Sequence, residues 1–154
     1  MKASGLIRKS SQGKPVFGFT DTETVKLDFD NMPLERVKFW ARKTMGKYRL
    51  GGFLILRSSE NSYHVLFNRT VSWVRNVGIV AWACLRTKHR RLTEWLVMQC
   101  IKHASTLRIS AKGQKPSPRI VCRYGKQDRQ IEGFLEYRKL IKQITRKLET
   151  ENQL

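Results

Sequence analysis

The sequence predicts an α+β domain in which helices pack on a mainly antiparallel sheet, and three observations support this class. Strand-like segments occur in adjacent pairs, and segments with helical spacing separate those pairs. Hydrophobic residues make up 40% of the chain, which is too many for a disordered protein. The length of 154 residues suits one domain rather than two. We therefore expect a single domain at 15–150, preceded by a flexible, basic N-terminal segment at 1–14.

Two alternating segments begin this domain. The first is PVFGFT (15–20), which alternates around Gly18, and the second is VKLDFD (25–30). In the second segment, one face carries Val25, Leu27 and Phe29, and the other carries Lys26, Asp28 and Asp30. The intervening DTET is a turn, so the two segments are predicted to form a β-hairpin with one apolar face.

A helix is predicted next, from Asn31 and Pro33, which suit a helix start, to about Tyr48. Its apolar residues recur at helical spacing, at Leu34, Val37, Ala41 and Met45. Two further strands follow, GFLILR (52–57) and YHVLFN (63–68), and the turn SSEN joins them.

The second half of the chain repeats this alternation. Residues 72–103 have a helical pattern that lapses near RTKHRR (86–91), which predicts two helices. Two strands follow, TLRIS (106–110) and RIVCRY (119–124), with the loop AKGQKPSP between them. The last helix is predicted from about Arg129 to Leu148.

The charge of the chain indicates a polyanionic partner. Lys and Arg number 31 against 12 Asp and Glu, a formal net charge of +19. The basic residues are spread along the chain and interleaved with aromatic residues, which favours nucleic acid over an anionic membrane surface. The longest apolar run, VGIVAWACL (77–85), is too short to span a bilayer. We expect no membrane association.

The cysteines indicate a reducing compartment. Cys84, Cys100 and Cys122 are far apart, odd in number and without a CxxC pair, which argues against disulfides and structural zinc. The first residues lack the apolar stretch of a signal peptide. We therefore expect a cytoplasmic protein with reduced thiols.

Asp28 and Asp30 are the first candidate site residues. Side chains at positions i and i+2 of a strand leave the same face, with Cα atoms about 6.5 Å apart. Two carboxylates at this spacing can hold Mg²⁺ or Mn²⁺, and such ions serve phosphoryl transfer. Two solvated aspartates, or aspartates paired with nearby Lys or Arg, remain the alternative reading of the same pattern.

Ser62 and His64 are the second candidates. They share one face of a strand, whereas Tyr63, Val65 and Phe67 share the apolar face. A hydroxyl and an imidazole can each hydrogen-bond a phosphate or sugar oxygen. The alternative is a half-exposed strand histidine without a functional role.

An apolar D-x-D strand, a helix and then a strand carrying S-x-H together resemble the first two motifs of the archaeo-eukaryotic primase superfamily. That superfamily includes the primase-polymerase domains of archaeal plasmids and viruses, and the resemblance covers about residues 16–124. It implies an RRM-like antiparallel sheet. It also implies that Asp28 and Asp30 are catalytic metal ligands, and that Ser62 and His64 contact the incoming nucleotide.

The stretch STLRIS (105–110) is similar to a basic strand that follows the histidine motif in some members of this superfamily. On this resemblance Arg108 and Ser110, which face outward from the predicted strand, would contact the nucleotide phosphates. The following residues add a basic patch predicted to bind nucleic acid, although a simple basic hairpin tip is the alternative. This patch comprises Lys112, Lys115, Arg119 and Arg123, the last two on one side of the final strand.

The superfamily normally supplies a third acid on a later strand, and neither TLRIS nor RIVCR contains one. The nearest acids are Asp128 and Glu94. The sequence thus predicts a small primase/polymerase-like nucleotidyltransferase domain of DNA replication that binds Mg²⁺ or Mn²⁺, nucleotides and single-stranded or primed DNA, with a partner replication subunit as a further candidate. The missing acid keeps open a catalytically degenerate RRM-like nucleic-acid-binding protein. A metal-dependent nuclease using the same aspartates is a more distant alternative.

Overall fold

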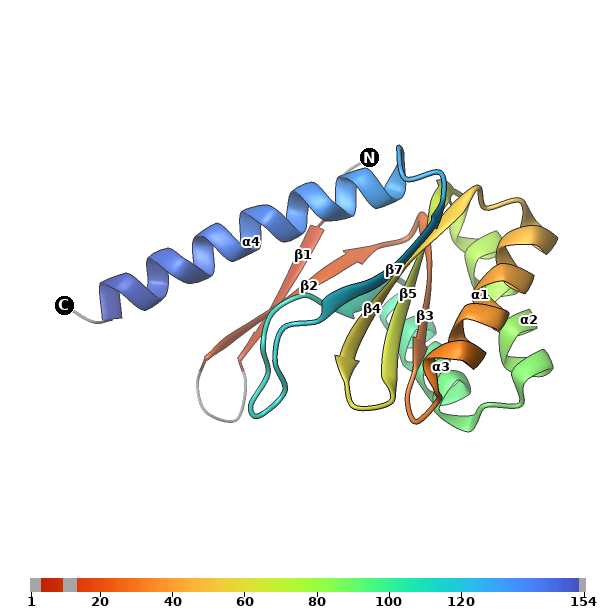
Figure 1. Cartoon of the computed structure of the whole chain (residues 1–154), viewed down its shortest axis with the longest axis horizontal. Helices are drawn as coiled ribbons and strands as arrows, with labels where there is room; N and C mark the ends of the chain where they lie inside the picture. The colour runs from red at the N-terminus through yellow and green to blue at the C-terminus, as the bar shows by residue number, and fades with distance from the viewer. Residues whose placement is uncertain (1–3, 10–13, 153–154) are drawn as a thin grey trace.

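The computed structural model describes residues 4–9 and 14–152, in which strands and helices alternate in blocks (Figure 1). The elements are β1 (Ser4–Lys9), β2 (Pro15–Asp21), β3 (Thr24–Phe29), α1 (Leu34–Tyr48), β4 (Gly52–Ser59), β5 (Ser62–Thr70), α2 (Trp73–Thr87), α3 (Arg90–Lys102), β6 (Ser105–Arg108), β7 (Arg119–Gly125) and α4 (Gln130–Asn152). From β2 onward this order is the one that the sequence predicts. The α+β class with antiparallel sheets is confirmed, and the packing is consistent with an RRM-like arrangement.

A four-stranded antiparallel sheet forms the centre of the protein, in the order β3-β5-β4-β7. β4 and β5 form the predicted hairpin, and Asn61 in its turn has a φ of 52°, a left-handed conformation that Asn tolerates. β3 pairs with β5 so that Asp28 lies opposite His64. The two sequence motifs are therefore cross-strand neighbours, with side chains on the same face of the sheet.

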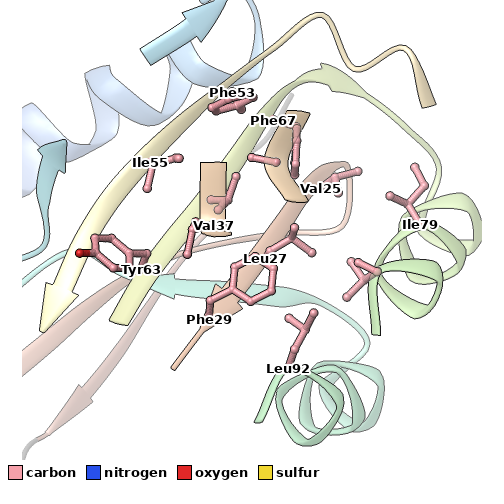
Figure 2. Close-up of a cluster of buried hydrophobic side chains, with 14 of the residues drawn as sticks. Val25, Leu27, Phe29, Val37, Phe53, Ile55, Tyr63, Phe67, Ile79 and Leu92 are labelled. Atoms are coloured by element: carbon pink, nitrogen blue, oxygen red, sulfur yellow. The ribbon is translucent and has the colours of Figure 1, made fainter. Parts of the chain in front are cut away.

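Helices α1, α2 and α3 cover one face of this sheet. The alternation along β3, β4 and β5 directs every second side chain toward them, as Figure 2 shows. This cluster includes Val25, Leu27, Phe29, Val37, Phe53, Ile55, Tyr63, Phe67, Ile79 and Leu92, all buried. The predicted break between two helices is confirmed at Lys88, whose φ of 52° ends α2 while its N–H donates to the carbonyl of Cys84.

The opposite face of the central sheet packs against a second sheet and α4 (Figure 1). The second sheet has the order β1-β2-β6. The buried side chains between these layers include Phe17, Phe19, Leu54, Leu56, Leu66, Leu107, Ile109, Ile131 and Phe134. Because the central strands are buried on both faces, a stretch such as GFLILR is nearly continuously apolar rather than strictly alternating.

The predicted hairpin of β2 with β3 is wrong, because the two strands belong to different sheets. β2 pairs with β1 and β6, whereas β3 pairs with β5. Between them the chain turns a corner at Asp21, whose carboxylate accepts hydrogen bonds from the N–H and the hydroxyl of Thr24. Alternation fixes which side chains share a face, but it does not fix which strands pair.

The N-terminal segment includes a strand. Residues 4–9, which lie within the segment predicted to be flexible, form β1 and pair with β2 along its length. Residues 1–3 and 10–13 of the same predicted segment lie outside the residues that the structure describes. In the described part of the chain, no helix combines the length and the apolar character needed to cross a membrane. Cys84, Cys100 and Cys122 have free thiols.

Candidate active-site cleft

A cleft of about 340 Å³ lies where the two sheets, α3 and the 112–115 hairpin meet. Its walls come from β2, β3, the ends of β4 and β6, β5 and the last turns of α3. The polar side chains that line it are Asp28, Asp30, Ser58, Ser59, His64, Gln99, Lys102, Thr106, Arg108, Lys112 and Lys115. The candidates that the sequence singled out from separate segments thus largely meet in one place.

The two aspartates face this cleft together. Asp28 is on β3 with its side chain 23% exposed, and Asp30 follows the end of the strand and is exposed. The pKa of Asp28 is raised from 3.8 to about 7, mainly by burial and then by the charge of Asp30, against the opposing effects of Lys115 and Arg108. Asp28 is therefore only partly ionised at neutral pH, and a cation bound between the two carboxylates would favour its ionised form.

His64 lies beside Asp28 but makes no hydrogen bond with it. Its Nε2 is 3.7 Å from the Asp28 Oδ1, which is too long, and its buried Nδ1 has no partner among the described residues. The pKa of His64 is lowered to about 3, mainly by burial and then by the nearby charges of Arg108 and Lys115. At neutral pH the pair is therefore not an ion pair. His64 presents a neutral imidazole, which can donate one hydrogen bond and accept another.

Arg108 lines the cleft, but some of its guanidinium N–H groups already donate hydrogen bonds to backbone carbonyls. Nη1 donates to Ser110 at 2.6 Å and to Pro116 at 2.9 Å, and Nη2 donates to Ser58 at 3.0 Å. These bonds tie the loop after β6 to the end of β4. Arg108 thus supplies positive charge to the cleft, while much of its hydrogen-bonding capacity holds the loop in place.

Lys112 and Lys115 form the tip of a tight hairpin beside the cleft. Each backbone N–H donates to the carbonyl of the other, at 3.0 and 2.9 Å, and Gly113 has a φ of 57°. Both side chains are exposed and line the cleft. The geometry is that of a basic hairpin tip, which was the alternative interpretation of this stretch. The hairpin also places two cations in the cleft that Asp28 and Asp30 line.

Two predicted nucleotide ligands lie away from the cleft. Ser62 is buried and lines an adjacent depression that shares Asp30, Ser59 and Lys115 with it. Ser110 is also buried, and its hydroxyl accepts a hydrogen bond from the Phe17 N–H at 2.8 Å. The outward orientation predicted for Ser110 is wrong, because β6 ends at Arg108 and the alternation is not continued beyond it.

Arg119 and Arg123 do not share a face of β7, so that prediction is also wrong. β7 is irregular: Cys122 lies opposite Ile55, and Ile120 lies opposite Leu56, which leaves Val121 as an extra residue. The bulge places Arg119 on the helix-covered face of the sheet, and it places Arg123 on the other face, in a groove along α4. Neither residue lines the cleft.

Sequence reasoning missed the contribution of α3. Trp95, Gln99 and Lys102 are spaced four and three residues apart, so they share one face of the helix and line the cleft. The Gln99 side chain accepts from the Thr106 N–H at 2.9 Å and donates to the Trp95 carbonyl at 3.0 Å, which joins α3 to β6. The available signal in the sequence was a polar residue, Gln99, one helical turn after Trp95.

The side chains present fit one divalent cation rather than two. Asp28 and Asp30 provide hard oxygen ligands of the kind that Mg²⁺ and Mn²⁺ prefer. Within residues 4–9 and 14–152, no three His, Cys, Asp or Glu side chains gather as a metal site would require. Asp128 accepts a hydrogen bond from Asn68, and Glu94 pairs with arginines of α3, so neither candidate third acid lines the cleft.

No protein-family model, no curated protein and no solved structure matches the chain. The resemblance to primases therefore stays a prediction that rests on the short motifs. What the cleft can do follows from its own geometry: it brings together two carboxylates, a neutral imidazole and several cations.

Proposed function

We propose that the cleft binds a nucleoside triphosphate with one divalent cation, and that the protein is a small nucleotidyltransferase of the primase-polymerase type. The observation that supports this proposal is that the candidate side chains converge on one cleft. Asp28, His64 and Arg108 come from three different strands, yet with Asp30 and the two hairpin lysines they line one cleft. A metal-bound triphosphate presents both a cation and phosphate oxygens, so it complements two carboxylates surrounded by Lys and Arg.

Each side chain has a separate role in this proposal. Asp28 and Asp30 would hold Mg²⁺ or Mn²⁺, which when bound neutralises phosphate charge and activates an attacking hydroxyl. Lys112 and Lys115 would contact the phosphates as mobile point charges. His64, neutral at pH 7, would donate a hydrogen bond to a phosphate or sugar oxygen without adding a charge. Arg108 would keep the hairpin over the cleft.

The partners of such an enzyme are also proposals. The formal charge of +19 supports a nucleic acid, and an end that carries a free hydroxyl would supply the attacking group. Single-stranded or primed DNA is the substrate that we propose, and a partner replication subunit would supply functions that the cleft lacks.

Primer extension tests this function directly. The protein is incubated with a primed template, labelled dNTPs or NTPs and Mg²⁺ or Mn²⁺, beside an Asp28→Ala/Asp30→Ala variant. Glu132→Ala/Glu136→Ala, on the exposed surface of α4, is the matched control because it removes the same two negative charges outside the cleft. We expect extension by the wild type and the control but not by the cleft variant. Extension that survives in the cleft variant would reject the assignment.

Metal binding provides a readout that does not depend on activity. A ligand that binds the folded state alone raises the unfolding temperature, and the increase grows with the logarithm of the ligand concentration once this exceeds Kd. We expect Mn²⁺ to raise the unfolding temperature of the wild type and of the Glu132→Ala/Glu136→Ala control, but not that of the Asp28→Ala/Asp30→Ala protein.

A second candidate function is a catalytically degenerate nucleic-acid-binding protein. Two observations favour it: no third carboxylate from the described residues lines the cleft, and three backbone carbonyls already accept hydrogen bonds from the Arg108 guanidinium. In that case the wild type extends no primer. The Asp28→Ala/Asp30→Ala variant then binds DNA equally or more tightly, because two negative charges leave a phosphate-facing surface.

A further inference from the structure

A second basic surface lies on the other side of the central sheet, over α1. The helix carries five Lys and Arg residues but a single acid, Glu35. Aromatic rings from α1 and the edge strand β7 lie among these cations. We call this surface the α1 platform, and it comprises Phe39, Arg42, Lys43, Lys47, Tyr48 and Tyr124.

Tyr124 is the best-positioned ring of the α1 platform. Its ring stacks on that of the buried Phe53, with centroids 5.3 Å apart and planes 15° apart, and it remains 43% exposed. The Arg42 guanidinium carbon lies 5.0 Å from the centre of the same ring. The core thus holds Tyr124 in one orientation, and a planar cation already lies over the ring.

The same pairing of ring and cation recurs along α1. Phe39 is 51% exposed, and the Lys43 Nζ lies 5.5 Å from its ring centre. The Lys47 Nζ lies 5.6 Å from the ring of Tyr48 and 5.4 Å from that of Trp82 on α2. Single-strand-binding proteins combine these two elements, with cations following the backbone and rings stacking on successive bases.

The α1 platform and the cleft lie on opposite faces of the central sheet. Tyr124 pairs across the strands with Phe53, which faces the helices, whereas Asp28 and His64 face the second sheet. The bulge in β7 places Arg119 on the helix-covered face as well. A strand bound along α1 would therefore leave the cleft open.

We infer that the α1 platform binds single-stranded nucleic acid, with bases stacked on Tyr124 and Phe39 and phosphates held by the lysines and arginines of α1. A base that stacks on Tyr124 displaces Arg42 from the ring, and the guanidinium then pairs with a phosphate. A duplex keeps its bases stacked internally and gains only the charge contacts. This site goes beyond the proposed function, because it needs neither the cleft nor a metal ion.

Fluorescence anisotropy with a labelled single strand of about 20 nucleotides, and with the matching duplex, tests this inference. We expect Tyr124→Ala to weaken single-strand binding by about fivefold or more, the loss of one stacked base, and to change duplex binding by less than about twofold. Tyr124→Phe keeps the ring and should bind like the wild type. Arg42→Gln should lower the slope of log affinity against log salt by about 0.7, the value for one phosphate contact to a single strand.

Phe39→Ala provides an independent variant, because Tyr124→Ala also removes a contact with the buried Phe53. The Phe39 ring is exposed and contacts Trp40 and Lys43, so its removal leaves the core intact. We expect the same selective loss of single-strand binding. Unchanged single-strand affinity in both alanine variants overturns the inference, and so does an equal loss for single strand and duplex. Binding to phosphatidylserine vesicles that both variants lose, with single-strand binding unchanged, overturns it in favour of a membrane surface.

The two proposals fail separately. Asp28→Ala/Asp30→Ala is the matched control for the α1 platform and should keep the effect of the Tyr124 substitutions on single-strand binding. If the wild type extends no primer but Tyr124→Ala still weakens single-strand binding, nucleotidyl transfer is rejected and the α1 platform stands. If primer extension depends on the aspartates but Tyr124→Ala binds single strands like the wild type, the α1 platform is rejected and nucleotidyl transfer stands.

Discussion

Lys26 and Asp28 are two residues apart on one face of β3, yet their surroundings differ completely. Lys26 is fully buried, and its ammonium donates to the Asp21 carboxylate at 2.6 Å, the Ser105 carbonyl at 3.0 Å and the Ser105 hydroxyl at 2.8 Å. All three N–H groups are therefore used. Burial lowers the pKa of Lys26 to about 8, against the opposing effect of Asp21, so it remains mostly charged at pH 7.

Asp28 has no such complement of partners. Its Oδ1 lies 3.7 Å from the His64 Nε2, too far for a hydrogen bond, and the buried Nδ1 of His64 has no partner among the described residues. The Lys26 cluster joins β3 to both β2 and β6 and thereby connects the two sheets. The difference indicates that the fully satisfied Lys26 has a structural role, whereas the unsatisfied Asp28 beside the cleft is free to bind the cation that we propose.

The largest effect is expected from breaking the satisfied pair. Lys26→Met leaves the Asp21 carboxylate buried without its cation, which should lower the free energy of unfolding by about 3–5 kcal/mol. Urea unfolding followed by circular dichroism measures this change. In the double variant Lys26→Met/Asp21→Asn no charge is left buried, so most of the loss should be recovered. A single variant as stable as the wild type would show that this pair does not connect the sheets energetically.

A smaller effect, of opposite sign, is expected at Asp28. Its pKa is about 7 in the folded protein against an ordinary 3.8, so between these values the folded state holds a proton that the unfolded state has released. Stability contributed by this proton is therefore present below about pH 4 and lost as the pH rises through about 7. Asp28→Asn cannot ionise, so at about pH 8 it should be more stable than the wild type by up to about 4 kcal/mol.

Unfolding free energies measured from pH 4 to pH 8 check this sign. The difference between Asp28→Asn and the wild type should vanish at the acid end and grow with pH. Glu132→Gln, an exposed carboxylate on α4, is the matched control and should follow the wild type throughout. A constant difference across this range would mean that Asp28 ionises as freely in the folded state as in the unfolded one.

The faces of the strands could be predicted from sequence, but their partners could not. Alternation correctly placed Val25, Leu27 and Phe29 in the core and put Asp28 on the same face as Lys26. The pairing of β2 with β1 and β6 depends on contacts distant in sequence, which alternation does not specify. The Lys26–Asp21 pair was missed for the same reason, because a predicted hairpin gives no cause to bury both charges.

The candidate site shows the same division. Asp28 and His64 meet because β3 pairs with β5 and both strands have the expected alternation. The faces of the two side chains could be predicted from alternation, whereas only the resemblance to primases implied that the two motifs lie together. Ser110 and Arg123 were misplaced, because a strand that ends early and a one-residue bulge each change the face to which a side chain points. Single-residue irregularities of this kind leave no periodic signal in the sequence.

The smallest effect on stability is expected at Arg108. This residue tests the comparison of Lys26 with Asp28, because it shares features with both. Arg108 lines the cleft like Asp28, but carbonyls of Ser58, Ser110 and Pro116 accept hydrogen bonds from three of its five N–H groups, so it is satisfied in large part. Arg108→Lys keeps the charge and loses the planar fork, so we expect the hairpin to open more readily by about 1.5 kcal/mol, a roughly tenfold faster amide exchange at Lys112 and Lys115. Lys112→Met, which removes a cation without touching these bonds, is the control, and its Lys115 amide should exchange at the wild-type rate. Unchanged exchange combined with weaker nucleotide binding in Arg108→Lys would instead make Arg108 a direct phosphate ligand, and a satisfied guanidinium would then be no guide to a structural role.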